Sequence, residues 1–376
     1  MKNLKKVLSL VLALAMALSL MTAAFAADAS DYKDYSKVTY KEAVDVMTAA
    51  GIFNGGDGNN FNPDATLNRE QAAKIITYML VGQTQADKLT TTIAPYSDVA
   101  ATRWSAGSIA YCTNEGIIAG DGNGRFNPTA PVLGTQFAKM LLVALGYDPK
   151  IEKLVGNEWA IKTAKLALSD DVDLDNGMEK LSLSDNLTRE QAAQMAFQTL
   201  TADMVYYTNK GTTVNTPDGT QVVVGASAPV KVANSTTDDY RTVKGDKDEV
   251  QQFCEKYFSD LKKVRSDSDE FERPAITWKF KSNTIGTYTD EADLTYTEEV
   301  KLGDIYKDLG LSSNLKKDDV KVYVDGASAT SNGIVKGDET NKLGGNGVLT
   351  EVFYDSDNDS AIITLVNTYL GTVTST

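Results

Sequence analysis

Two arginines occupy the same place in a hexapeptide that the sequence repeats. The chain reads TREQAA around Arg189 and NREQAA around Arg69, and an apolar helical pattern follows each copy. Each arginine thus falls in the first turn of a helix, where the helix dipole disfavours a positive charge. The same turn carries unpaired backbone N–H groups, so an exposed guanidinium beside them suits an anion such as a carboxylate. The spacing predicts anion binding, and pairing with a nearby acid, Asp64 or Asp185, is the structural alternative.

The chain contains no histidine, which narrows the chemistry that it could perform. The usual general base, the usual zinc ligand and the histidine-activated nucleophiles are therefore absent. The acidic segments 171–177 and 355–360 resemble calcium loops but lack the glycine and glutamate that such loops need at positions six and twelve. SDN at 184–186 and SDLK at 259–262 resemble serine β-lactamase motifs in reversed order, without Lys-Thr-Gly. We expect no catalytic residue, no metal and no cofactor, although a carboxylate pair for glycoside hydrolysis stays open.

Residues 1–26 have the features of a signal peptide. Three lysines precede an apolar run from Val7 to about Met21, and small residues lead to a cleavage site after Ala26. No later apolar run is long enough to span a membrane. Removing three lysines and no acids would change the net charge from −14 to −17, and such a surface repels nucleic acid and anionic lipid. We expect an exported chain that binds anions only at local basic sites.

A unit of two helices and a glycine-rich loop recurs along the first half. GIFNGGDGNNFNP at 51–63 aligns without a gap with GIIAGDGNGRFNP at 116–128, and helical patterns flank both. A third copy spans 147–205, where LSDDVDLDNGMEKLSLS replaces the glycine loop. Each helix pair would bury one face only, so the three copies are expected to share a core. A capping-box pattern marks the helix starts at TREQAA and NREQAA.

The character of the sequence changes near residue 205. Residues 206–376 are rich in threonine, valine and Gly/Pro turns such as PDG, and the final strand pattern runs to the end of the chain, as in a fragment or a short family member. One amphipathic helix is predicted over 246–264, and a short one near LGDIYKDLGL. The predicted strands are TQVVVGA, APVKVA, AITWKFKSNTIGTYT, EADLTYTEEV, VKVYVDG, VLTEVFYD and AIITLVNTYLGTV. Cys112 and Cys254 fall on two separate helical patterns, so we expect separate domains and free thiols rather than a disulfide.

With these repeats in view, residues 32–200 resemble three S-layer homology repeats, the modules with which many bacterial surface proteins hold cell-wall polysaccharide. The family pattern has an aromatic-x-Asp entry, a Trp at the first helix, Gly-Ile, a glycine-rich loop with Phe-x-Pro, and Thr-Arg-Ala-Glu at the second helix. The matching residues are Asp34, Gly51, Ile52, Gly55, Phe61, Pro63 and Arg69 in the first copy, Tyr96, Asp98, Trp104, Gly116, Ile117 and Gly120 to Pro128 in the second, and Trp159, Thr188, Arg189 and Glu190 in the third.

Each copy departs from the family pattern at one place. Thr39 stands where the first copy would have its Trp. Leu133 and Gly134 stand where the second copy would have Thr-Arg, and the third copy lacks the glycine loop. The number of working sites therefore does not follow from the number of repeats.

The resemblance implies a multidomain fold. Residues 27–205 would be all-α, with three helical repeats (about 32–82, 94–146 and 147–205) around a pseudo-threefold axis and ligand grooves between neighbours. Residues 206–376 would form a β-rich α+β extracellular half.

The resemblance also implies non-covalent anchoring of an exported protein at the cell surface. The ligand implied is a secondary cell-wall polysaccharide with pyruvylated amino sugars, attached to peptidoglycan, and other surface-layer proteins are candidate partners. No sortase signal is present. The rival interpretation is a wall hydrolase with a carboxylate-based site in residues 206–376. The ligand-binding residues implied are Asp34, Gly55, Arg69, Asp98, Trp104, Gly120, Trp159 and Arg189, with core packing as the alternative for both tryptophans.

Overall fold

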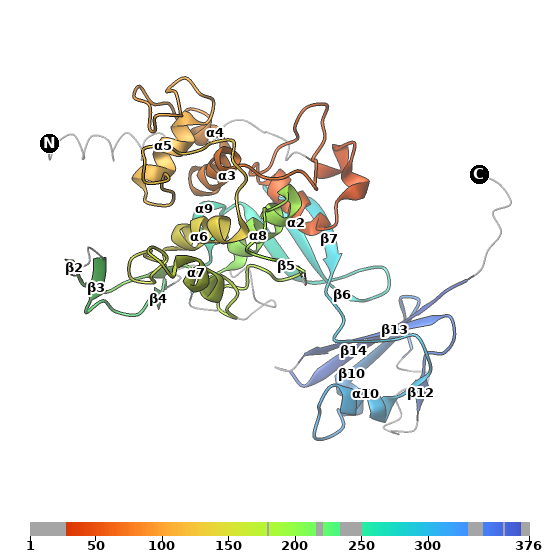
Figure 1. Ribbon diagram of the computed structural model, residues 1–376. Helices are drawn as coiled ribbons and strands as arrows, with labels where there is room; N and C mark the ends of the chain where they lie inside the picture. Colours follow the sequence, from red (N-terminus) through yellow and green to blue (C-terminus); the bar gives the residue numbers. More distant parts are fainter. Residues whose placement is uncertain are drawn as a thin grey trace.

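The computed structural model describes residues 28–178, 180–215, 221–233, 250–329, 341–355 and 358–369. Helices fill its first half and strands its second, as the sequence predicts (Figure 1). The predicted signal peptide and the PDG turn at 217–219 lie outside the described residues. Within the described ranges, no helix is long and apolar enough to cross a membrane.

The helices of the first half follow the predicted order. They are α2 (Lys41–Ala49), α3 (Arg69–Val81), α5 (Ala106–Asn114), α6 (Gly134–Leu145), α7 (Trp159–Ala167) and α8 (Arg189–Thr201), with the short α4 (Gln83–Ala86), η1 (Ala29–Asp31) and η2 (Tyr35–Lys37). The second helix of each copy packs against the first helix of the next: α3 against α5, α6 against α7, and α8 back against α2. Both predicted capping boxes, before α3 and α8, are present.

Backbone hydrogen bonds close the three copies into a ring just before their second helices. The N–H of Leu67 donates to the carbonyl of Leu187 at 2.9 Å, Leu187 donates to Val132 at 3.0 Å, and Val132 donates back to Leu67 at 3.0 Å. Two residues further on, the first residues of α3, α6 and α8 each donate to the other neighbouring copy, in the opposite cyclic order. The three helix starts are thus held together by main-chain contacts that do not depend on side-chain type.

A first hydrophobic core extends from η1 into strands beyond residue 205. Trp278 is fully buried, and its ring packs edge-to-face on Phe197 of α8 with centroids 5.5 Å apart. Its Nε1 hydrogen is donated to a carboxylate oxygen of Glu42 in α2 at 2.6 Å. Tyr288 likewise donates its hydroxyl hydrogen to Asp45 of α2 at 2.6 Å. The change in composition near residue 205 therefore does not coincide with the end of this core.

The predicted helix over 246–264 is wrong for most of its length. Residues 246–249 lie outside the described residues, and α9 covers only Phe253–Tyr257. Strand β5 (Leu261–Ser268) begins soon after and pairs antiparallel with β6 (Pro274–Phe280), which pairs with β7 (Asn283–Thr289). Because sheet pairing and burial depend on tertiary partners, they outweighed a helical apolar spacing in this segment.

A second core belongs to a five-stranded sheet later in the chain, drawn in blue in Figure 1. The strand order is β11-β10-β14-β13-β8, with β10 and β14 parallel and the other neighbours antiparallel. Helix α10 (Leu302–Asp308) packs against the sheet and confirms the predicted short helix. The strands are β8 (Leu294–Tyr296), β10 (Val320–Val324), β11 (Ala327–Ser328), β13 (Val348–Asp355) and β14 (Ser360–Asn367).

Three short strand pairs lie outside these two sheets. They are β1 (Val205–Tyr206) with β4 (Val230–Lys231), β2 (Thr212–Asn215) with β3 (Gln221–Val224), and β9 (Val300–Lys301) with β12 (Lys342–Leu343), and η3 (Lys317–Asp319) precedes β10. The β2–β3 hairpin lies beside the helical half in Figure 1, far from the five-stranded sheet.

Candidate functional site

The two predicted arginines make equivalent contacts to two different loops. Arg69 donates from Nε to the carbonyl of Phe126 at 2.9 Å and from Nη2 to the carbonyl of Ala119 at 3.0 Å. Arg189 donates from Nε to the carbonyl of Phe61 at 2.8 Å and from Nη2 to the carbonyl of Asn54. We call residues 54–63 the first loop and residues 119–128 the second loop. Each arginine thus reaches from the start of its helix to the glycine-rich loop of a neighbouring copy.

The expectation that these arginines are exposed is wrong, because both are half-buried. The carbon atom of the Arg69 guanidinium lies 4.6 Å from the ring centroid of Phe126, and that of Arg189 lies 5.0 Å from the centroid of Phe61. Burial lowers the pKa of both guanidinium groups. Neither forms an ion pair with Asp64 or Asp185 among the described residues, so backbone carbonyls take the place of the acid that the structural alternative required.

Asp34 and Asp98 accept hydrogen bonds from the backbone of the first and the second loop. Asp98 accepts hydrogen bonds from the backbone N–H groups of Phe126 and Asn127, both at 2.8 Å. Asp34 accepts the equivalent pair in the first loop, both at 2.7 Å. Burial alone would raise the pKa of Asp98, but these N–H donors outweigh it and lower the pKa below 3.8. Both carboxylates therefore stabilise the conformation of a loop.

Gly55 and Gly120 allow a tyrosine to approach the loop backbone. A Cβ atom at Gly120 would stand 2.6 Å from a ring carbon of Tyr96, and one at Gly55 would stand 2.8 Å from a ring carbon of Tyr32. Such distances leave no room for a side chain without displacing the ring. These glycines are therefore explained by packing inside each copy, although Gly120 also lines the cavity described next.

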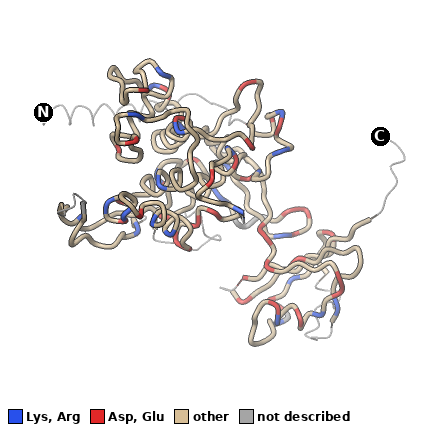
Figure 2. Tube along the Cα trace, viewed as in Figure 1, with Lys and Arg blue, Asp and Glu red and all other residues tan. Residues whose placement is uncertain are grey.

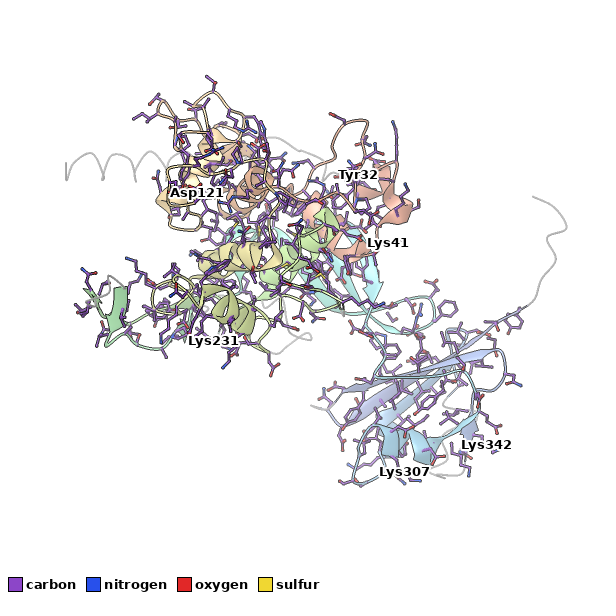
Figure 3. All side chains as sticks on the ribbon, viewed as in Figure 1. Tyr32, Lys41, Asp121, Lys231, Lys307 and Lys342 are labelled. Carbon is purple, nitrogen blue, oxygen red and sulfur yellow. The ribbon has the colours of Figure 1, made fainter. Side chains whose placement is uncertain are left out.

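A cavity of about 490 Å³ brings Arg69, Gly120 and Trp159 together from three different copies. We call it the Arg69 groove. Asp121, labelled in Figure 3, lies at its edge in the second loop and is held by the backbone N–H groups of Asn123 and Arg125. The full lining is Arg69, Ile117, Ile118, Ala119, Gly120, Asp121, Phe126, Asn127, Ala130, Pro131, Gln136, Lys139, Met140, Val155, Gly156 and Trp159.

The two tryptophans differ in their surroundings. Trp159 lines the Arg69 groove, with the Lys139 Nζ atom 5.8 Å from the centroid of its ring. Trp104 is 58 % exposed and is not part of the groove lining. Sequence reasoning did not single out Lys139. The signal was present, because QFAK and QAAK place a lysine at the same position of α6 and α3.

Charges of both signs are spread over the whole trace (Figure 2), so the cations of the Arg69 groove are a local feature of an acidic chain. Glu70, beside Arg69, is buried and not part of the groove. It accepts two hydrogen bonds from Arg103 at 2.7 and 2.8 Å and one from the Ser105 hydroxyl at 2.6 Å. In the third copy, Glu190 accepts from the backbone N–H of Thr39 at 2.9 Å. The glutamate of the hexapeptide therefore joins neighbouring copies, a role that the sequence alone did not reveal.

Gly134, which stands in α6 where an arginine would align, has a steric reason. A Cβ atom there would lie 2.7 Å from the Cα atom of Leu183 in the third copy. The backbone segments around Gly134 and Leu183 approach so closely that no arginine could be accommodated at position 134 without moving the backbone. This third junction therefore lacks the cation that the other two possess.

Comparisons with known proteins identify parts of the first two copies. The family model of the S-layer homology domain matches residues 31–73 and 95–138. A relative named "Surface layer protein" from Brevibacillus choshinensis is 29 % identical over 168 residues, which cover 45 % of this chain and 15 % of the relative.

Two further relatives match a similar region. A "Cell surface protein" from Thermoanaerobacter kivui is 27 % identical over 237 residues, which cover 62 % of this chain and 30 % of the relative. A "Middle cell wall protein" from Brevibacillus brevis is 29 % identical over 167 residues, which cover 44 % of this chain and 16 % of the relative. The matches span less than a third of the length of these relatives. Segments of this chain therefore match the S-layer homology domain, and part of the chain is similar to bacterial surface-layer and cell-wall proteins.

Proposed function

We propose that the chain anchors itself non-covalently to the cell wall by binding a secondary cell-wall polysaccharide in the Arg69 groove. The observation that carries the proposal is the presence of Arg69, Lys139 and Trp159 in one cavity. Arg69 uses two of its five N–H groups on backbone carbonyls, which leaves three for a ligand carboxylate. The indole of Trp159 offers an apolar face to a sugar ring. A pyruvylated amino sugar, which the family resemblance implies, has both features.

We also propose that residues 147–205 are a third repeat and that the three repeats surround a pseudo-threefold axis. The support is the closed ring of hydrogen bonds among Leu67, Val132 and Leu187, together with the cyclic packing of each second helix on the next first helix. The proposed limits are those expected from the sequence, with the repeats in 27–205 and the β-rich region in 206–376. Residues 250–290 add to the core of the repeats.

The β-rich region would project as a structural or adhesive segment, with other surface-layer proteins as partners. The relatives named above are surface and wall proteins by their names, which favours a non-enzymatic role over a wall hydrolase. Incubation with purified wall should release no reducing ends, and a release that a carboxylate substitution in residues 206–376 abolishes would support the hydrolase instead.

Retention on purified sacculi tests the anchor. The chain without residues 1–26 should sediment with native sacculi and stay in solution with sacculi stripped of their secondary polymer. Arg69→Ala should weaken retention about ten- to a hundredfold, the effect of losing one charge-assisted contact of about 1.5–3 kcal/mol. Arg125→Ala is the matched control. Arg125 is an exposed cation of the second loop, which Arg69 contacts, but it is not part of the groove lining. Equal retention on stripped sacculi would contradict the proposal.

A further inference from the structure

Five residues after the start of the second helix, two copies have a lysine and the third has a glutamine. The residue there is Lys74 in α3, Lys139 in α6 and Gln194 in α8. This position faces a junction between two copies in each helix. The residue found there therefore shows which charge each junction contains. Their surroundings are different.

Lys139 is a cation without an acidic partner. It lines the Arg69 groove, and no ion pair within the described part of the chain includes it. Its Nζ atom lies near the face of Trp159, and burial lowers the pKa of its ammonium group. A half-buried ammonium group in a cavity that a guanidinium also lines lacks compensation, and an anion in the same cavity would supply it.

Lys74 is compensated by the segment that follows α3. Its Nζ atom pairs with a carboxylate oxygen of Asp87 at 2.8 Å, and the Tyr78 hydroxyl donates to the same oxygen at 2.8 Å. This segment, Gly82–Asp87, contains the short helix α4. The acid that Lys139 lacks is thus built into the chain beside Lys74.

The same segment reaches the loop that Arg189 contacts. Gln83 donates from Nε2 to the side-chain oxygen of Asn54 at 3.3 Å, and the carbonyl of Asn54 accepts from Arg189. The Oε1 atom of Gln83 also lies 2.9 Å from where a Cβ atom of Gly51 would stand. At the equivalent Gly116 no atom lies within 4 Å of that position. Gln83 therefore fills the space beside the first loop, whereas the equivalent space beside the second loop is open.

The third junction has no cation at either position. Gln194 donates its amide hydrogen to the carbonyl of Asn176 at 2.9 Å, and Gly134 replaces the arginine. Residues of β7 and of the turn between β5 and β6 line the cavity that contains Gln194.

We propose that Lys139 is the second cation of the ligand site and a specificity-determining residue for a carboxylate-bearing sugar, while Gln83 and Asp87 close the equivalent junction at Arg189 and Lys74. This inference rests on the proposed function, since it assigns binding to one groove of three. Arg69 holds the carboxylate in its fork, and Lys139 contributes a point charge from the lining of the same cavity.

Two matched substitutions in the full chain without residues 1–26 test the assignment. Lys139→Gln should weaken retention on native sacculi at least tenfold and leave the melting temperature nearly unchanged. Lys74→Gln should change retention less than twofold and lower the melting temperature, because it breaks the pair with Asp87. Sacculi whose carboxylates have been reduced through carbodiimide activation should retain the wild-type chain no better than native sacculi retain the Lys139→Gln variant, because both cations then lose their anion.

The outcomes separate the two proposals. Loss of retention with Lys74→Gln as large as with Lys139→Gln would overturn the assignment to one groove and leave the anchor function standing. Unchanged retention of Lys139→Gln would overturn the role of this lysine alone. A wild-type chain that is not retained on native sacculi would overturn the proposed function and this inference together.

Discussion

Arg189 donates from Nε to the carbonyl of Phe61, 128 residues earlier in the chain, at 2.8 Å. The contact joins the third copy to the first, and Arg69 makes the equivalent contact to Phe126 at 2.9 Å between the first copy and the second. These arginines therefore stabilise the junctions between copies whether or not a ligand is bound. Structural support is therefore one use of these side chains, and the anion binding that we propose for Arg69 would be a second.

Arg189→Ala should lower the stability of the repeats and leave wall retention largely intact. The substitution removes two charge-assisted hydrogen bonds to backbone carbonyls, and each is worth about 1.5–3 kcal/mol. At about 2–4 °C per kcal/mol for a domain of this size, the melting temperature should fall by several degrees. Arg69→Ala is the comparison, which should lose both stability and retention. An unchanged melting temperature for Arg189→Ala would contradict the structural role.

Glu70→Gln should remove a part of the stability that is present only above about pH 4.5. Burial alone would raise the pKa of Glu70, but hydrogen bonds from Arg103 and Ser105 outweigh it and lower the pKa below 4.5. Because the folded-state pKa is the lower one, this contribution is complete above the unfolded-state pKa and is lost as the pH falls through the folded value.

Urea unfolding at pH 7 and at stepwise lower pH values measures the effect. The difference in unfolding free energy between wild type and Glu70→Gln should be largest at pH 7 and shrink below about pH 4.5. A difference that stays constant across this range would show that the charge of Glu70 contributes nothing.

Trp278→Ala should destabilise the helical repeats although Trp278 lies in the β-rich half. The indole is fully buried against Phe197 and donates a hydrogen bond to Glu42, so its removal leaves a cavity and breaks that hydrogen bond. We expect a loss of about 3–5 kcal/mol, measured as a lower midpoint of unfolding. A chain that ends at residue 205 should likewise unfold more easily than one that ends at residue 291. Equal midpoints for the two truncated chains would contradict the shared core.

Cys112 and Cys254 should not react with a thiol reagent in the folded chain. Both are fully buried free thiols in the first core, and burial raises the pKa of Cys112 to about 12. Because the thiolate is the reacting form, dithionitrobenzoate should modify neither residue under native conditions and both in denaturant. Rapid modification of the native protein would contradict the burial of the residue that reacts.

The sequence by itself determined the local elements of the repeats. The spacing of apolar residues, the capping boxes and the Phe-Asn-Pro loops are local features, so the bounds of α3, α6 and α8 and the two equivalent loops could be read directly. The absence of histidine and the recurrence of Arg69 and Arg189 in one motif also needed no structure. The strands around Val320 and Val348 were visible for the same reason, because their alternation is local.

Only the tertiary structure decided which copies meet and what each junction contains. Arg69, Gly120 and Trp159 come from three copies, and their meeting depends on the ring of backbone bonds. The segment around Leu261 became a strand because β6 lies beside it, a partner that no local pattern indicates. The difference between Lys74 and Lys139 is likewise invisible in the helices, where both occupy one position of the repeat. It arises because Asp87 folds back onto Lys74, whereas Lys139 faces Trp159 and an open cavity.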